Sequence, residues 1–383
     1  MAKTLIIEGW RFLPHSYAVV NQWQLLALKR RGDVEIKFVD MPYYNPKWQR
    51  HAGLFDKVEE DLLNSIPTAR PGECADVSFR ITFPYSFTPS SSSRTVVFGT
   101  LEYQVVIPGM IATVEAYEQA RQGNTEVKVI TPSRWSAAGF KTAGFDPERV
   151  FIIPHGVDTG IFRPKPEERD GIRQQLLLGP DDFVFLAVGA MTGNKGMDLL
   201  ARAFGEVHRK YPHARLLLKG IDTLYNSKAM LFGTLEALLA SEKQRIVQNT
   251  RYIGAPFSFR GMALLYQAAD VFVSPYRAEG FNIPAVEAAA CGLPVICTRG
   301  GPTDDFVTDA FARKINSRKT MFISEGCACY RLDPDVEHLT ALMMSAIEDI
   351  AWRKRALAAG PAHVRANYTW DILADRLIHR LWA

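Results

Sequence analysis

Cysteine is scarce in this sequence, and its spacing excludes the common metal sites. Of the five cysteines, Cys327 and Cys329 are the closest pair, and they are too close together for a zinc knuckle and lack a second pair. We therefore expect no metal site. Reduced thiols are the expected state, as in a cytoplasmic protein.

Long apolar runs are also missing. No stretch reaches the roughly 18 apolar residues that a spanning helix needs. The apolar part of residues 1–8 is too short for a secretory signal peptide and resembles a buried first strand instead. We expect a cytoplasmic protein, and a position at the inner face of the membrane stays open.

Neither sign of charge dominates the sequence. Lys and Arg total 45 against 41 for Asp and Glu, a net charge of +4. So small an excess allows an anionic substrate or peripheral membrane contact, but it does not indicate a nucleic-acid partner. The length of 383 residues and the hydrophobic content of 47% are ordinary for a globular protein of two domains.

The first 40 residues predict a β-α-β unit. Residues 4–8 are an apolar strand, residues 17–30 place their apolar side chains on one helical face with Ser16 as the expected cap, and residues 34–39 alternate as a strand does. Such a unit implies a parallel sheet. The Gly-x-Gly-x-x-Gly fingerprint of a dinucleotide fold is absent. The loop of residues 9–15 follows the first strand, where open α/β sheets bind ligands.

A second strand-helix series begins after a charged, proline-containing linker at residues 159–180. Residues 183–189 form its first strand, and the loop Gly193-Asn194-Lys195-Gly196 precedes a helix. A lysine in such a loop can reach a diphosphate as a point charge. The alternative is a solvated loop lysine.

The most informative stretch is residues 270–298, which predicts strand, loop, short helix and strand. Pro284 suits the first helical turn and Gly292 suits the left-handed stop. The helix start has free N–H groups that favour a phosphate. Glu279 and Glu287 flank it and can accept hydrogen bonds from sugar hydroxyls. The alternative is that both acids are solvated charges near a helix dipole.

This stretch resembles the E-x7-E signature of retaining glycosyltransferases of the GT-B architecture, in particular glycosyltransferase family four, the group 1 glycosyltransferases. Residues 130–158 and 183–204 resemble the same family in the expected order. The resemblance implies an α/β fold with two doubly wound Rossmann-like domains facing a cleft. It assigns residues 1–165 to an acceptor-binding domain, with the terminal helix 368–383 packing back on it, and residues 166–367 to a nucleotide-sugar-binding domain.

The resemblance also implies an activity, the transfer of a sugar with retention from a nucleotide-diphosphate sugar to a hydroxyl of a glycan, polysaccharide or lipid. A UDP-sugar is favoured as donor, with no further cofactor. Glu279 would orient the donor sugar, Glu287 would hold the ribose, and Lys195 would neutralise the diphosphate. The remaining expected donor contacts are Gly189, Asn194, Ile253, Gly280, Phe281, Asn282 and Ile283.

Two departures from the family pattern stand out. Ala190 occupies the place of the usual arginine. Arg277 or Arg299 are candidate substitutes, and the alternative is that the helix N-terminus carries more of the phosphate charge. The usual histidine after the strand at 95–98 is absent. Thr100 and Glu102 are the residues available there, and Glu102 is the candidate catalytic residue of the first domain. The aromatic segment 41–48 is a candidate acceptor region.

Two other classes of function remain open. One is a different nucleotide-sugar enzyme of the same architecture, such as a 2-epimerase; a phosphorylase would need a pyridoxal lysine, for which no distinctive context appears. The other is a non-catalytic scaffold that kept the fold.

Overall fold

The computed structural model describes residues 3–382, which form two compact units. The first unit runs to Gly156 and also takes in Met321–Tyr330 and the segment from Trp370. The second comprises Val157–Thr320 and Arg331–Thr369. The boundary at Gly156 lies a few residues before the position 165 expected from the sequence.

The first unit contains a six-stranded parallel sheet of order β2-β1-β3-β4-β5-β6. Its strands are β1 (Lys3–Gly9), β2 (Val34–Asp40), β3 (Val77–Ile81), β4 (Arg94–Phe98), β5 (Lys128–Thr131) and β6 (Val150–Ile152). Its helices are α1 (Ser16–Arg31), α2 (Lys57–Asn64), α3 (Val114–Arg121), α4 (Arg134–Thr142) and α13 (Trp370–Trp382).

Helix α1 begins one residue earlier than the sequence suggested. His15, not Ser16, is the cap, and its Nδ1 accepts a hydrogen bond from the backbone N–H of Tyr17. The terminal helix α13 packs along α1, where the Trp23 and Trp370 rings stack with centroids 6.4 Å apart. The apolar face of α13 is thereby buried.

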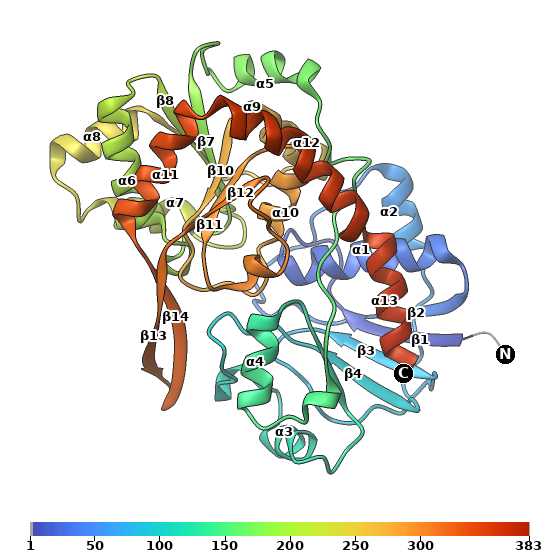
Figure 1. Cartoon of the computed structure of the whole chain (residues 1–383). Helices are drawn as coiled ribbons and strands as arrows, with labels where there is room; N and C mark the ends of the chain where they lie inside the picture. The colour runs from blue at the N-terminus through green and yellow to red at the C-terminus, as the bar shows by residue number, and fades with distance from the viewer. Residues whose placement is uncertain (1–2, 383) are drawn as a thin grey trace. The chain divides into compact units, whose positions relative to one another are not determined.

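The second unit repeats the design with six parallel strands in the order β12-β11-β10-β7-β8-β9 (Figure 1). They are β7 (Phe183–Val188), β8 (Ala214–Lys219), β9 (Thr250–Ile253), β10 (Val271–Ser274), β11 (Val295–Thr298) and β12 (Ala312–Ile315). The two doubly wound sheets confirm the predicted fold class. Strand order reverses between β7 and β10, and such a switch point is where open α/β sheets bind ligands.

Helices lie on both faces of the second sheet. They are α5 (Arg169–Gln175), α6 (Met197–Lys210), α7 (Ser227–Leu235), α8 (Ala240–Gln248), α9 (Phe259–Ala268), α10 (Ile283–Ala290), α11 (Val336–Glu348) and α12 (Ile350–Asn367). The helix expected over 335–360 is two helices, because Asp349 interrupts the first and accepts a hydrogen bond from the N–H of Trp352 as the cap of the second.

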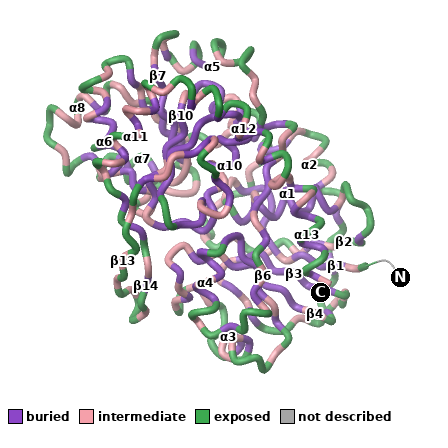
Figure 2. The backbone as a smooth tube through the Cα atoms, viewed as in Figure 1, coloured by how far each residue is buried: buried purple, intermediate pink, exposed green. Residues whose placement is uncertain are grey.

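The alternation of side chains along β8 separates the two faces. Leu216 and Leu218 join the apolar core under α6 and α11, which is buried in the tube view of Figure 2. They also line an apolar cavity of about 180 Å³ beneath α7 and α8. Leu217 and Lys219 therefore face the other side of the sheet, toward α9 and α10. The cavity consequently lies on the opposite face of the sheet from Leu217 and Lys219.

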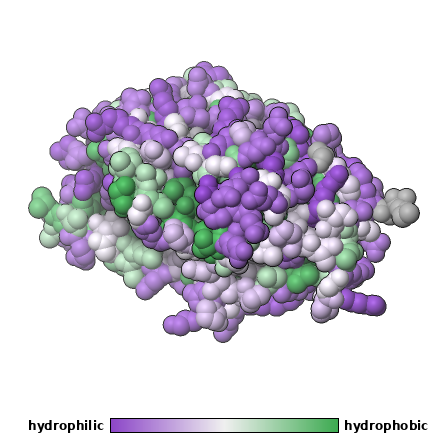
Figure 3. Space-filling view, turned by 90° about the horizontal axis from the view of Figure 1, so that it is seen from below, coloured by the Kyte–Doolittle hydropathy of each residue, from purple (hydrophilic) through white to green (hydrophobic). Residues whose placement is uncertain are grey.

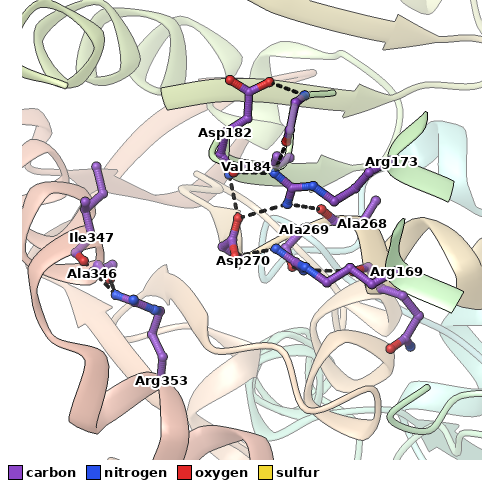
Figure 4. Close-up of polar contacts among 12 residues, drawn as sticks. Arg169, Arg173, Asp182, Val184, Ala268, Ala269, Asp270, Ala346, Ile347 and Arg353 are labelled. Carbon is purple, nitrogen blue, oxygen red and sulfur yellow. Dashed lines mark hydrogen bonds and ion pairs between the residues drawn. The ribbon is translucent and has the colours of Figure 1, made fainter. Parts of the chain in front are cut away.

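An ion-pair cluster ties α5 to the amino ends of the strands (Figure 4). Asp270 accepts hydrogen bonds from Arg169, at 2.7 Å, and from the backbone N–H of Val184, at 2.8 Å. Arg173 lies 3.5 Å from the same carboxylate. Because this edge is opposite the carboxyl ends of the strands, we assign the cluster to folding rather than to ligand binding.

The structure contains a hairpin that was not predicted from the sequence, formed by β13 (Ser317–Ser324) and β14 (Cys327–Pro334). Its turn holds Glu325 and Gly326 at φ of 48° and 75°, which an acid-glycine pair between alternating segments could have signalled. Met321 and Ile323 are 58% and 64% exposed. More generally, the space-filling view in Figure 3 shows hydrophobic patches among hydrophilic side chains on the face seen from below.

Candidate functional site

The loops after β7 and β10 meet at the switch point of the second sheet. Lys195 comes from the first loop and Glu279 from the second, and Lys195 Nζ lies 2.8 Å from Glu279 Oε1. Both side chains are largely buried. Two residues 84 positions apart, predicted separately as phosphate and sugar ligands, are therefore brought together as an ion pair.

Backbone contacts hold the two loops in register. Gly196 has φ of 69°, and a Cβ at this position would lie 2.0 Å from the carbonyl oxygen of Pro275. Asn194 accepts hydrogen bonds through its carbonyl oxygen from the N–H groups of Arg277, at 2.7 Å, and Ala278, at 3.2 Å. Asn194, expected to touch the donor, thus also joins the loops. Only glycine fits at 196 without separating them.

Of the two candidate replacements for the arginine missing at Ala190, Arg277 is paired with an acid, and the role of Arg299 stays a prediction. Arg277 donates two hydrogen bonds to the carboxylate of Asp198, at 2.6 and 2.7 Å. This bidentate hydrogen bonding raises the pKa of Arg277, and the Asp198 carboxylate neutralises its positive charge. Arg299 is exposed. Local sequence could not reveal the Asp198 partner, which lies on α6.

Helix α10 begins at Ile283, as the sequence suggested, and Gly292 stops it with φ of 78°. Asn282 caps the helix from a left-handed conformation, with φ of 82°. Its side chain accepts a hydrogen bond from the N–H of Ala285 and donates one to Ser274 Oγ, at 2.9 Å. The Asn282 side chain is therefore used in positioning the helix start, and any contact with a ligand would involve its backbone.

Glu287 lies one turn into α10 and is buried. Tyr266 on α9 donates its hydroxyl hydrogen to Glu287 Oε2, at 2.7 Å. Burial raises the pKa of Glu287 to about 8, and the Tyr266 hydrogen bond opposes that shift. The Glu287 carboxyl lies one turn after the start of α10 and contacts α9. It can therefore accept hydrogen bonds from a ligand that extends from the start of α10 toward α9.

The other predicted residues fall into three groups. Gly189 and Ile253 lie at the carboxyl ends of β7 and β9, at the expected edge of the sheet. Gly280 and Phe281 are buried, and the Phe281 ring packs 5.0 Å from that of Phe306, which makes its side chain part of the core. Ile283 is the first residue of α10, so its backbone N–H belongs to the helix start.

Glu102 belongs to the first unit, and its catalytic role stays a prediction. It is partly exposed, and its backbone carbonyl accepts a hydrogen bond from Trp135 Nε1, at 2.8 Å.

Sequence reasoning missed Tyr266 and Lys219. A tyrosine inside an amphipathic helix gives no signal of its own, because its carboxylate partner is 21 residues away. Lys219 ends β8 directly after the apolar run Leu216-Leu217-Leu218, and a lysine at the carboxyl end of a predicted strand is a signal that the sequence offers. Within residues 3–382 no group of His, Cys, Asp and Glu is arranged to hold a metal ion.

Comparison with known proteins identifies the protein family to which this site region is similar. Residues 182–321 match the family described as glycosyl transferases group 1, and this part of the chain is a domain of that family. The match covers β7, Lys195, Glu279 and Glu287 together. The two parallel sheets are those of the GT-B glycosyltransferase fold.

The chain is also similar to curated glycosyltransferases over about two thirds of its length. The chain is 30% identical over 273 residues to a GDP-mannose-dependent monoacylated alpha-(1-6)-phosphatidylinositol monomannoside mannosyltransferase of Corynebacterium glutamicum, covering 69% of this chain and 64% of the relative. It is 29% identical over 257 residues to a D-inositol 3-phosphate glycosyltransferase of Segniliparus rotundus, covering 67% of this chain and 50% of the relative. The chain thus spans between half and two thirds of these relatives.

Solved structures extend the likeness to the fold of the whole chain. The Anabaena protein HepE, solved with UDP and glucose, has a TM-score of 0.69 at 15% identity and 99% coverage of both chains. A glycosyltransferase from Rickettsia africae has a TM-score of 0.72 at 13% identity, covering 100% of this chain and 98% of its own. Within the described residues, no helix has the length and apolar character needed to cross a membrane.

Proposed function

We propose that the protein is a retaining glycosyltransferase that uses a nucleotide-diphosphate sugar and glycosylates a hydroxyl group. The observation that carries this proposal is the Lys195–Glu279 pair at the switch point, with Glu287 one turn into α10. A cation, a helix start and two buried carboxylates fit the three parts of such a donor, which are the diphosphate, the sugar and the ribose.

In this mechanism the diphosphate lies between Lys195 and the start of α10. As the bond from the anomeric carbon to the diphosphate oxygen breaks, its electron pair stays on that oxygen. The ammonium of Lys195 and the backbone N–H groups at the helix start stabilise the charge that develops there. Since both are in place before reaction, little rearrangement is needed.

Binding of the donor also has to separate an ion pair. Lys195 exchanges Glu279 for the diphosphate, and Glu279 then accepts hydrogen bonds from hydroxyls of the donor sugar. The acceptor oxygen attacks the anomeric carbon on the face that the leaving group departs from, and its proton passes to the departing oxygen. The configuration at the anomeric carbon is therefore retained.

The donor and the acceptor are further parts of the proposal. A UDP-sugar is the donor favoured by the resemblance to the family, whereas the name of the Corynebacterium relative supports GDP-mannose. The names of the mannosyltransferase relatives support a glycolipid acceptor. Acceptor binding by the first unit, a role for Glu102 and a location at the inner face of the membrane remain predictions.

The test uses two variants, Lys195→Ala and Glu287→Gln, assayed with UDP-, GDP- and ADP-sugars against lipid and glycan acceptors. We expect roughly a hundredfold or larger loss of transfer in Lys195→Ala, the size typical for a lost transition-state donor. In Glu287→Gln we expect weaker donor binding. Lys210→Ala is the matched control, because Lys210 lies on the same unit and is more than half exposed.

Transfer at the wild-type rate in both variants would refute the assignment. Conversion of the nucleotide sugar without any acceptor would instead favour an epimerase of the same architecture. Failure of the wild-type protein to bind any nucleoside diphosphate in calorimetry would favour the non-catalytic scaffold.

A further inference from the structure

Lys219 is a buried charge that the proposed mechanism does not use. It is 4% exposed and ends β8. Its ammonium donates a hydrogen bond to the carbonyl of Gly220, at 2.5 Å, and no ion-pair partner lies within salt-bridge distance among the described residues. Desolvation lowers its pKa to about 8, with Asp222 opposing the shift. An ammonium group has three N–H donors. In a buried environment the donors that lack an acceptor cost free energy unless a further group accepts hydrogen bonds from them.

The sheet register places Lys219 beside the candidate site. Val188 of β7 and Ile253 of β9 are its partners on either side. Side chains of paired residues in a parallel sheet share a face, and here that face is the one toward α9 and α10. Ser274, which is hydrogen-bonded to Asn282 at the start of α10, ends β10 on the same face. Lys219 thus lies at the carboxyl edge, two strands along from the helix start.

The direction in which a bound nucleotide would run follows from Glu287. Its partner Tyr266 is on α9, so a ribose held by Glu287 lies between α10 and α9. The base beyond it then reaches the loop that leads from β9 into α9. In that loop the partly exposed Phe257 offers an aromatic face, and its ring centroid lies 5.5 Å from Lys219 Nζ. The unused ammonium is therefore beside a surface on which a base can stack.

We propose that Lys219 determines which nucleotide the site accepts, by donating a hydrogen bond from its ammonium to a ring carbonyl oxygen of the base. The inference rests on the proposed function. An ammonium has donors and no acceptor. It suits the carbonyl of uracil or guanine, and it opposes the amino group that cytosine or adenine carries at the same position. Lys219 would thus select keto bases over amino bases.

Two pairs of nucleotides isolate this contact. UDP and CDP differ at positions 3 and 4 of the pyrimidine, and IDP and ADP differ at positions 1 and 6 of the purine. In each case a ring N–H and a carbonyl replace an unprotonated ring nitrogen and an amino group. We expect the wild-type protein to bind the keto member of each pair more tightly in calorimetry. In Lys219→Met, the affinity for the keto member should fall by roughly 10- to 100-fold, the range for a hydrogen bond to a charged group. The affinity for the amino member should change little.

The controls separate recognition from folding. Lys228→Met removes an exposed lysine nine positions further on and should leave both ratios unchanged. Lys219→Met should melt at or above the wild-type temperature without nucleotide, since it removes a buried charge. If it fails to fold, Lys219→Gln replaces it, with a shorter neutral donor that should lower both ratios.

The outcomes are distinct. Equal wild-type affinities within both pairs, or ratios that Lys219→Met leaves unchanged, would overturn the role of Lys219 while leaving the proposed function intact. Absence of binding for every nucleotide would refute the proposed function itself.

Discussion

Each of the two sheets has six parallel strands, but the side chains at their switch points differ. In the second unit the loops at this place bring Lys195 to Glu279, with Glu287 and Lys219 buried nearby. In the first unit the corresponding place, between β1 and β3, is filled by aromatic rings. Trp10 is 1% exposed and its ring lies 5.3 Å from that of His15.

Several polar groups of the first switch point are hydrogen-bonded within the unit, although the buried Oδ1 of Asn21 accepts no hydrogen bond from the described residues. Trp10 Nε1 donates to the carbonyl of Pro42, at 2.9 Å, and the hydroxyls of Tyr17 and Tyr85 share a hydrogen bond of 2.9 Å. The second switch point keeps charges that a charged ligand could pair with. The comparison teaches that the same topology offers a site in both units, and that side-chain chemistry decides which of them suits a diphosphate.

The largest effect should come from breaking the second switch point by Gly196→Ala. The added Cβ meets the Pro275 carbonyl oxygen and the φ of 69° disfavours alanine, so we expect a loss of about 3 to 5 kcal/mol in unfolding free energy. Sugar transfer should fall with it. Gly193→Ala is the control, because a Cβ there has nothing within 4 Å. Equal melting temperatures for the two variants would contradict the close packing of the loops.

Buried titratable groups should give the two units opposite responses to pH. In the second unit the folded pKa of Glu287, about 8, lies above its ordinary 4.5, so its contribution to stability falls as pH rises between these values. In the first unit the folded pKa of His155, about 3, lies below its ordinary 6.5, so its contribution falls as pH falls between these values.

Each contribution can be measured with one variant. Denaturant unfolding from pH 5.5 to 7.5 should show that wild type loses stability relative to Glu287→Gln by at most about 3 kcal/mol. From pH 6.5 down to 4.5, wild type should lose a similar amount relative to His155→Gln. Parallel curves for wild type and either variant would show that the group is not buried as described.

A smaller effect is expected at the hydrogen bond that orients Glu287. Tyr266→Phe removes it and should lower the unfolding free energy by about 1 to 2 kcal/mol. Since that bond lowers the pKa of Glu287, the variant should also move the pH dependence of stability to higher pH. Tyr276→Phe is the matched control, a buried hydroxyl bonded to Thr303, and should leave that pH dependence in place.

Sequence predicted the fold, and the loops and helix start that carry the candidate site residues, because these depend on local patterns. The strands, the start of α10 at Ile283 and its stop at Gly292 follow from periodicity and capping within a few residues. What it could not predict depends on pairing across the sheet. Asp198 engages Arg277 from a different helix, and the face to which Lys219 points is fixed only by strand register.

The smallest effect should come from the exposed ion pairs that join α1 and α13 in the first unit. The side chains of Arg30 and Asp371 are 40% and 68% exposed, and their atoms lie 2.8 Å apart. Water screens such a pair, so Asp371→Ala should change the unfolding free energy by less than about 1 kcal/mol. The stacked Trp23 and Trp370 rings, not the charges, should then hold α13, and a larger loss in thermal or denaturant unfolding would reverse that ranking. The stability of the first unit would in that case depend on ion pairs, as that of the second unit does. The two units would then differ only in the side chains at their switch points.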